Sequence, residues 1–336
     1  PPRSTLFPYT TLFRSRFFLD HFQYYKGTEN IAPVAVLRTY PTMAYSSYNT
    51  QYSTYLFEQT LIQTRIPFDI IFDRHLEEEL SKYKVLVLAN QECMTDDQIG
   101  KVKSFVKNGG GLVVTGSTSL YNEWRRMRLR MGLRDMFDRD LPLPSEVIKA
   151  TDNSTTGISG DFRLYSHSSL VRKLEGYSEA ESSQVRNEYG KGRIVYIPEI
   201  KPGISKPASA ANTSEYWVLP ENFTELEEAV KWAAGEDTLS VEVQAPKYVT
   251  MEWLMQKNHN RMLIHLVNYN VRNQPEVKNI AVRLKIPEGK RVKHVTVLTP
   301  DTEVKSGSLP SHMDKGWLNF SVPGLNAYDL ITVQFE

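Results

Sequence analysis

The arrangement of apolar residues between Ile31 and Gly235 constrains the fold of this chain more than any other feature. Short runs rich in Val, Ile and Leu alternate there with longer amphipathic stretches, which is typical of parallel strands joined by crossover helices. Because the runs are almost continuously apolar, we expect a sheet that is covered on both faces. The predicted strands are Val34–Leu37, Phe68–Phe72, Val85–Ala89, Leu112–Thr115 and Arg193–Ile197. The pattern therefore predicts an α/β domain.

Two amphipathic segments have the end signals of helices. In each, a polar residue and a Glu or Gln three positions later can form a capping box ahead of an apolar face, and a glycine follows the last turn. The capping pairs are Thr95 with Gln98 and Asn222 with Glu225, and the terminal glycines are Gly109 and Gly235. We therefore expect helices over residues 95–108 and 222–235, and a third, less regular helix around residues 52–62.

The pattern of the chain changes twice. Residues 121–191 are rich in Ser and Thr and have no long periodic segment, so we interpret them as an insertion that carries short strands. After Asp237 the apolar residues alternate with a period of two, and about seven short strands in roughly 100 residues are typical of a β-sandwich. The predicted domains are residues 31–236 for the α/β part and residues 237–336 for the sandwich.

Charge and composition exclude several classes of partner. The 40 basic and 39 acidic side chains leave a net charge of +1, which provides no long-range field for nucleic acid or an anionic membrane. The strongest apolar run, Val85–Ala89, is far shorter than the roughly 20 residues of a membrane-spanning helix. The single Cys93 excludes an internal disulfide, and the histidines show no metal-ligand spacing, so no metal site is predicted. Nothing in the sequence indicates the compartment.

The first fifteen residues do not have the pattern of a natural leader. They lack a continuous apolar core and a small-residue cleavage site, so they match neither a signal peptide nor a transit peptide. Thr5 to Ser15 resembles the in-frame translation of a common sequencing adapter. We therefore expect residues 1–15 to be foreign to the protein and the natural sequence to begin near Arg16, with a natural tail as the alternative.

A run of glycines, Gly109 to Gly111, lies between the first predicted helix and the strand that follows it. A phosphate-binding loop follows a strand and opens a helix, whereas these glycines precede the strand. We expect them to end the helix and to permit a tight entry into the sheet. The loop after that strand, Gly116–Ser119, lies at the carboxyl edge where open α/β sheets bind ligands, but it has no Lys and no Gly-x-Gly-x-x-Gly pattern. No cofactor is predicted.

Several motifs, in the same order, resemble one known family. They are residues 82–89, 95–98, 106–116, 119–124, 133–137, 189–196, 230–235 and 263–268. This set resembles the amidotransferase-like domain that follows the barrel in family 42 β-galactosidases and related glycosyl hydrolases, where it is called the trimerisation domain. The resemblance covers most of the chain from about Arg16. It implies a flavodoxin-like α/β fold with helices on both faces of the sheet, followed by an all-β sandwich, and residues 16–30 resemble a linker from a barrel.

The resemblance also has consequences for activity. It implies self-association, as in a homotrimer, and a parent glycosidase whose two catalytic carboxylates lie in a barrel that this chain lacks. The true amidotransferases of this fold carry a nucleophilic Cys on the turn after a central strand, activated by a His. The matching turn here, Thr115–Ser117, has no Cys, and Cys93 follows a different strand. We therefore predict no catalytic residue in this chain.

Five polar residues follow or approach the carboxyl ends of predicted strands. They are Asn90, Glu92, Ser117, Glu123 and Glu199. Because the carboxyl ends of parallel strands meet at one edge of a sheet, these residues form a candidate ligand-binding site. A peripheral role, such as lining the sugar cleft of a neighbouring subunit, is a further hypothesis for the three glutamates.

Two other hypotheses stay open. A stand-alone α/β enzyme, or a small-ligand or carbohydrate-binding module, would use the carboxyl edge of the sheet and would need a deep polar pocket there. Alternatively, the sandwich would bind carbohydrate through Trp253, Trp317 and Tyr269, although Trp253 alternates with core residues and is expected inside.

We interpret the basic run Trp124–Arg130 as a solvated or subunit-facing segment and not as a nucleic-acid site.

Overall fold

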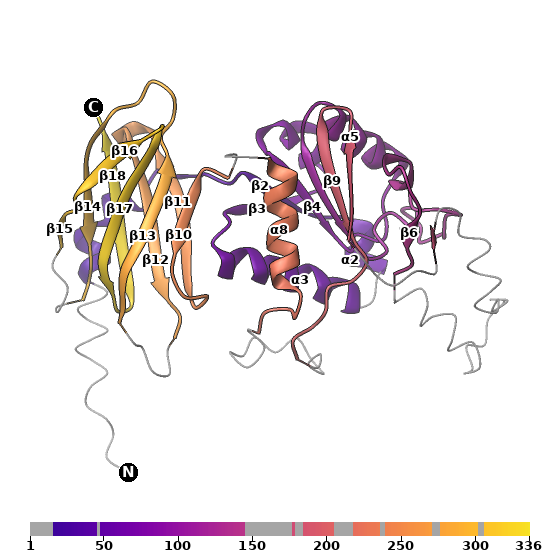
Figure 1. The fold of residues 1–336 in the computed structure, drawn as a ribbon, viewed down its shortest axis with the longest axis horizontal. Helices are drawn as coiled ribbons and strands as arrows, with labels where there is room; N and C mark the ends of the chain where they lie inside the picture. The colour runs from indigo at the N-terminus through magenta and orange to yellow at the C-terminus, as the bar shows by residue number, and fades with distance from the viewer. Residues whose placement is uncertain are drawn as a thin grey trace, which may run out of the picture. The chain divides into compact units, whose positions relative to one another are not determined.

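The computed structural model of the chain describes residues 16–45, 48–144, 177–178, 184–204, 218–235, 239–270, 276–301 and 306–336 (Figure 1). The chain divides into two units. The α/β unit comprises Pro33–Leu61 and Phe68–Thr238. The sandwich unit comprises Leu239–Glu336, Ile62–Pro67 and the residues up to Ala32. The predicted boundary between residues 236 and 237 falls outside the described part of the chain.

The order of strands in the central sheet matches the predicted fold class. The sheet runs β3-β2-β4-β5-β9-β8. Its strands are β2 (Val34–Arg38), β3 (Phe68–Phe72), β4 (Val85–Ala89), β5 (Gly111–Thr115), β8 (Val185–Tyr189) and β9 (Gly192–Ile197). The neighbouring pairs are parallel except for β8 with β9. Counted along the chain, the parallel strands stand in the order 2-1-3-4-5, which is the flavodoxin-like order. The predicted α/β fold is confirmed.

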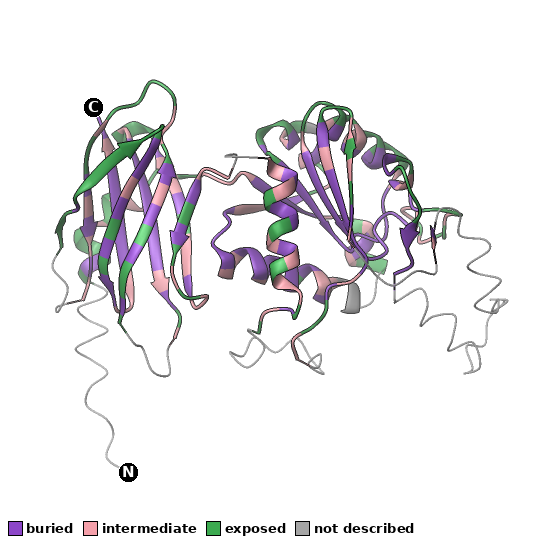
Figure 2. Ribbon diagram, in the orientation of Figure 1, coloured by how far each residue is buried: buried purple, intermediate pink, exposed green. Residues whose placement is uncertain are grey.

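The central strands are buried on both faces. Every residue of β4 and β5 is buried, as their continuous aliphatic runs predict (Figure 2). Helix α8 packs against β4, β5 and β9, and α5 packs against β9. The α-helices are α2 (Tyr40–Tyr45), α3 (Tyr48–Thr64), α4 (His75–Glu78), α5 (Asp96–Lys107) and α8 (Phe223–Ala234). The short 3-10 helices are η1 (Phe22–Tyr24), η2 (Leu80–Lys82), η3 (Arg134–Met136) and η5 (Lys257–His259).

The capping prediction is confirmed for α5 and wrong for α8. At α5 the Thr95 hydroxyl accepts the backbone N–H of Gln98 at 3.0 Å, and Gln98 Oε1 accepts the backbone N–H of Thr95 at 2.9 Å. At α8 the Asn222 side chain makes no cap hydrogen bond. Its amide nitrogen donates to the backbone carbonyl of Glu199 at 3.0 Å, and its oxygen accepts the N–H of Lys201 at 2.9 Å. Asn222 therefore ties the start of α8 to the loop after β9.

The glycine run has the predicted structural role. Gly109 has a φ of +115°, and its N–H donates to the carbonyl of Val106 at 2.9 Å, so it ends α5. A Cβ added at Gly111 would lie 2.3 Å from the backbone oxygen of Ala233 in α8. Because only glycine permits this approach, the run positions the start of β5 against α8.

The described part of the predicted insertion contains short strands. Strand β6 (Leu141–Pro142) pairs in parallel with β7 (Tyr177–Ser178), and β8 forms the antiparallel edge of the central sheet. An antiparallel bridge between Tyr121 and Met127 closes a hairpin. Residues 145–176 and 179–183 of this segment lie outside the described part.

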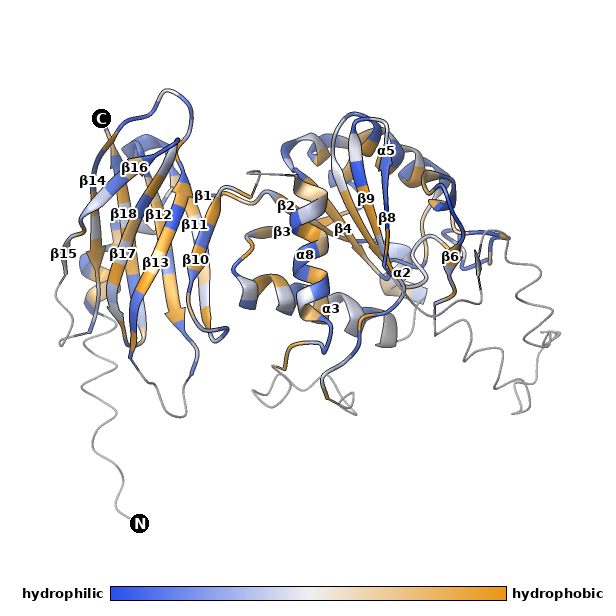
Figure 3. Cartoon of the chain, in the orientation of Figure 1, coloured by the Kyte–Doolittle hydropathy of each residue, from blue (hydrophilic) through white to orange (hydrophobic). Residues whose placement is uncertain are grey.

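Two antiparallel sheets face each other in the sandwich unit. They run β1-β11-β12-β18-β14-β15 and β10-β13-β17-β16. Alternate side chains of both sheets form one core, and the alternation is visible in the hydropathy colouring of Figure 3. Trp253 is 2% exposed and lies in this core, as predicted. The predicted β-sandwich is confirmed. The strands are β1 (Glu29–Asn30), β10 (Val241–Gln244), β11 (Val249–Gln256), β12 (Arg261–Asn268), β13 (Val277–Lys285), β14 (Val292–Leu298), β15 (Gly307–Ser308), β16 (Ser311–Asp314), β17 (Trp317–Leu325) and β18 (Tyr328–Phe335).

Residues 16–30 pack on the outer face of the six-stranded sheet. Phe17 lies in a small buried cluster with Leu263 of β12 and Leu330 of β18. Strand β1 extends the sheet by pairing with β11. The segment is therefore part of the sandwich unit, and its predicted role as a linker from a barrel stays a prediction.

Candidate functional site

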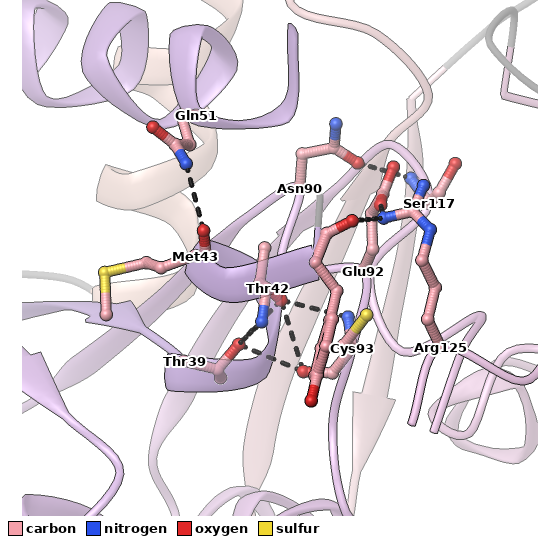
Figure 4. A network of polar contacts seen from close by, with 10 residues as sticks. Thr39, Thr42, Met43, Gln51, Asn90, Glu92, Cys93, Ser117 and Arg125 are labelled. Carbon is pink, nitrogen blue, oxygen red and sulfur yellow. Dashed lines mark hydrogen bonds and ion pairs between the residues drawn. The ribbon is translucent and has the colours of Figure 1, made fainter. Parts of the chain in front are cut away.

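The turns after β4 and β5 meet at the carboxyl edge of the central sheet (Figure 4). Asn90 directly follows β4, and Ser117 lies two residues after β5. The backbone N–H of Asn90 donates to the hydroxyl of Thr115 at 3.0 Å, and Asn90 Oδ1 accepts the backbone N–H of Ser117 at 2.8 Å. Asn90 and Ser117 therefore lie together, as the topology predicts.

The turn after β5 is filled by packed side chains. Gly116 and Asn90 both have left-handed backbone conformations, with φ of +58° and +53°. A Cβ at Gly116 would lie 2.5 Å from Asn90 Oδ1, so the amide occupies the space over the turn. Ser117 is 2% exposed. Its backbone N–H donates to Asn90, and among the described residues no histidine hydrogen-bonds to Ser117 as in a nucleophile activated by histidine.

Gln91 is absent from the predicted site residues, although it makes several hydrogen bonds at this edge. Its Oε1 accepts the backbone N–H of Thr39 at 2.9 Å. Its Nε2 donates to the Thr54 hydroxyl at 3.2 Å and to the Ala89 carbonyl at 3.0 Å. The side chain is buried, so these bonds link the ends of β2 and β4 to α3. The polar run 90–92, directly after an entirely apolar strand, is the sequence signal that identifies it.

Cys93 is fully buried, and α2 holds its backbone. Its N–H donates to the hydroxyl of Thr42 at 2.9 Å. Its carbonyl accepts hydrogen bonds from the hydroxyls of Thr39 and Thr42 at 3.0 and 3.2 Å. Burial shields the thiol from solvent, which favours a structural role over a nucleophilic one.

Glu92 is buried and forms an ion pair. Nη1 of Arg125 lies 3.0 Å from Glu92 Oε2, and the same nitrogen donates to the carbonyl of Tyr45 at 2.7 Å. The predicted basic surface run therefore has an inward-pointing member. The ion pair connects the hairpin of residues 121–128 to the end of β4, so the Glu92 carboxylate has a structural role.

The structure does not bring Glu123 and Glu199 into this arrangement. Both residues are partly exposed, and the hydrogen bonds and the ion pair given above for Asn90, Glu92 and Ser117 do not involve their side chains. Glu199 contributes through its backbone carbonyl, which accepts a hydrogen bond from α8. The role of the five residues as one ligand-binding set stays a prediction.

A cavity of about 90 Å³ lies beside this edge, between the end of β2 and α3. Thr42, Thr54 and Arg38 contribute to its lining. Arg38 makes two hydrogen bonds to Glu58, at 2.8 and 2.5 Å. Burial raises the pKa of Glu58 above its ordinary value, and the Arg38 guanidinium opposes that increase. Small-molecule sites usually have volumes of roughly 300–1,000 Å³, so this cavity has room for solvent but not for a sugar.

The described ranges contain neither a cluster of side chains that could hold a metal ion nor a helix that could span a membrane. No group of three or more His, Cys, Asp and Glu side chains there is arranged to hold a metal ion. None of the helices described is long and apolar enough to cross a membrane.

The hairpin of residues 121–128 projects apolar side chains beside the carboxyl edge. Asn122 Oδ1 accepts the backbone N–H groups of Trp124 and Arg126 at 3.1 and 2.9 Å, which fixes the turn. Arg128 pairs with Asp96 at 2.6 Å and so anchors the base. Three large side chains in this hairpin and directly after it are exposed, and we call them the hairpin surface. They are Trp124 (67% exposed), Met127 (43%) and Leu129 (63%).

The sheet order defines the class of the first domain. It is a flavodoxin-like α/β domain, followed here by antiparallel β-sheets. The family described as "Beta-galactosidase trimerisation domain" matches residues 36–203, which is half of the chain. The chain therefore belongs to this family.

Two solved structures illustrate the likeness. The α-L-fucosidase isoenzyme 2 from Paenibacillus thiaminolyticus is 18% identical, with a TM-score of 0.61 over 95% of this chain and 51% of that one. The β-galactosidase Gan42B from G. stearothermophilus is 16% identical, with a TM-score of 0.50 over 91% of this chain and 41% of that one. At these identities the likeness shows the fold alone, and the chain spans about half of the fucosidase and less of Gan42B. No curated protein matches the chain.

Proposed function

We propose that this chain is the self-associating, non-catalytic C-terminal region of a glycoside hydrolase of the β-galactosidase type, whose hydrolytic barrel lies outside this sequence. Membership of a trimerisation family implies self-association. The chain corresponds to 51% of a solved fucosidase and 41% of a solved β-galactosidase, which leaves room in such a parent for a catalytic domain.

The arrangement of carboxylates supports a non-catalytic role. Glycoside hydrolysis ordinarily needs two carboxyl groups facing one bond, roughly 5 to 9.5 Å apart. At the carboxyl edge Glu92 is buried in an ion pair with Arg125, while Glu123 and Glu199 are partly exposed. The neighbouring turn is filled by Asn90 and holds a buried Ser117. The described edge therefore offers neither a free acid and base pair nor an activated nucleophile.

The exposure of the hairpin surface is the observation that most directly supports self-association. Trp, Met and Arg are enriched at protein interfaces, and an exposed tryptophan held by a fixed backbone loses little entropy on binding. Trp124 and Met127 are exposed on such a hairpin, which Arg125 and Arg128 anchor through ion pairs. A cyclic trimer is built from head-to-tail contacts, in which one patch meets a different patch of the next copy. We assign the hairpin surface to one side of that contact.

Light scattering on size-fractionated protein tests this assignment. The wild-type chain should form an oligomer, and Trp124→Ala should shift the mass towards one copy of 38.6 kDa. Tyr269→Ala is the control, because Tyr269 is also a large exposed aromatic side chain, 58% exposed, and lies in the sandwich unit. An oligomer that survives Trp124→Ala, or dissociates equally in both variants, contradicts the assignment.

An activity assay distinguishes the proposal from a stand-alone enzyme. The purified chain should not hydrolyse aryl β-galactosides or α-fucosides. If it does, and Glu92→Gln, Glu123→Gln or Glu199→Gln abolishes the reaction, the carboxyl edge is a catalytic site and the proposal is wrong.

A further inference from the structure

The outer face of the four-stranded sheet contains a depression of about 440 Å³. The strand register places one polar side chain from each strand in a single row across it. From β10 to β16 these are Glu242, Arg283, Asn319 and His312. The volume is within the usual range of small-molecule sites, whereas the cavity at the carboxyl edge of the other unit is not.

Small side chains form the floor of this depression. Ala281 of β13 and Ser321 of β17 are paired neighbours in the next row, and Gln244 of β10 pairs with Ala281. Longer side chains of the first row, such as Arg283, stand beside them. The side chains of the row that contains Ala281 and Ser321 are shorter than those of the row that contains Arg283. This difference in length produces the depression.

Six of the ten residues that line the depression have polar side chains, and their charges nearly cancel. The carboxylate of Glu242 lies 3.5 Å from the Arg283 guanidinium, so the two charges offset each other. Arg283 also stacks on Trp317 at 4.3 Å from the ring centroid, and Trp317 is only 4% exposed. Amide, hydroxyl and imidazole groups complete the lining and provide both hydrogen-bond donors and acceptors. This combination suits a neutral ligand with many hydroxyl groups.

Other classes of ligand fit this face less well. A protein interface core uses large exposed apolar anchors, whereas the larger apolar side chains that line this depression, Val282 and Phe320, are buried. Single-stranded nucleic acid needs a positive groove with exposed aromatic rings for stacking, and here the ring of Trp317 is covered. The opposite sheet has apolar outer residues such as Leu263 and Leu330, and Phe17 packs on them. The four-stranded sheet presents its polar face to solvent.

We propose that this depression binds a neutral oligosaccharide laid across the four strands, held by hydrogen bonds to Glu242, Arg283, Asn319 and His312. The inference is independent of self-association, which uses the α/β unit. It also differs from stacking on Trp317 and Tyr269, because Trp317 is covered and Tyr269 does not line the depression.

Affinity electrophoresis of the full chain tests the proposal. Gels contain soluble galactan, xylan or mixed-linkage glucan as neutral probes, and dextran sulfate as the charged comparator. At least one neutral polysaccharide should retard the wild-type chain. Ala281→Trp fills the floor without removing a hydrogen-bonding group and should weaken that retention about tenfold or more, equivalent to 1.4 kcal/mol.

Lys278→Trp is the matched control. Lys278 is exposed on the same strand and does not line the depression, so the same substitution there should leave retention unchanged. Thermal unfolding establishes that both variants are folded, and Asn319→Ala provides a second, smaller change if Ala281→Trp does not fold. Absence of retention by all three neutral probes, retention by dextran sulfate alone, or equal retention of Ala281→Trp and wild type overturns the proposal.

Discussion

Asp329 is expected to keep its proton in the folded state up to neutral pH. It lies on β18 and is fully buried, and neither carboxylate oxygen has a partner with good hydrogen-bond geometry among the described residues. Burial raises the pKa of Asp329 from 3.8 to about 7; the side chain of Thr299 opposes this increase, and the charge of Asp301 adds to it. A buried carboxylate with so little hydrogen bonding is costly to ionise, so this residue should lower the stability of the sandwich unit at alkaline pH.

The sign and size of this effect follow from proton linkage. Because the folded pKa is raised, the unfolded chain releases the proton above about pH 4, whereas the folded chain holds it until about pH 7. A difference of about 3 pKa units corresponds to about 4 kcal/mol at pH 8 and to almost nothing at pH 4. Asp329→Asn removes the titration, so the variant should be more stable than wild type by up to that amount at pH 8.

Urea unfolding at pH 8, 6 and 4.5, followed by tryptophan fluorescence, measures the difference. With a slope of about 1–3 kcal/mol per molar urea, the midpoint of Asp329→Asn should rise by about 1 M or more at pH 8, and the difference should shrink to about a quarter of that at pH 4.5. Asp314→Asn, at an exposed position on β16, should change neither value. Equal midpoints of Asp329→Asn and wild type at pH 8, or a gain that does not depend on pH, would refute the reasoning.

Two further changes test other parts of the fold. Burial lowers the pKa of His265 to about 4, so the folded state excludes a proton that the unfolded chain binds below about pH 6.5. The free energy of unfolding should therefore fall by up to about 3 kcal/mol between pH 6.5 and pH 4. His265→Gln should remove this pH dependence when both proteins are unfolded by urea across that range. Gly111→Ala places a Cβ against the Ala233 carbonyl and should lower the free energy of unfolding by about 1–3 kcal/mol. Gly100→Ala lies on an open face of α5 and should raise it by up to about 1 kcal/mol. Equal melting temperatures of the two variants would contradict the packing argument.

The fold was largely predictable because its signals are local. Continuous aliphatic runs such as Val85–Ala89 identify buried strands, and the capping box of Thr95 and Gln98 lies within four residues. The predicted cap at Asn222 is wrong because its side chain bonds instead to the loop after β9, about twenty residues earlier in the chain. Such a contact depends on tertiary packing, which short-range spacing does not contain.

The candidate site was predictable only in part. The strand order brings Asn90 and Ser117 together, because both follow neighbouring parallel strands. The partner of Glu92 was not predictable, since Arg125 lies in a run that has the composition of a solvated surface. Glu199 lies beyond the end of its strand, where the direction of a side chain no longer follows from the pleat of the sheet.

The mass of the wild-type chain in solution tests the central claim most directly. Sedimentation velocity over a wide range of concentration should give an oligomer whose mass is a multiple of 38.6 kDa and which dissociates on dilution. Three copies are the expected number. A single species of 38.6 kDa at the highest concentration would contradict the claim that this chain carries the self-association of its parent protein.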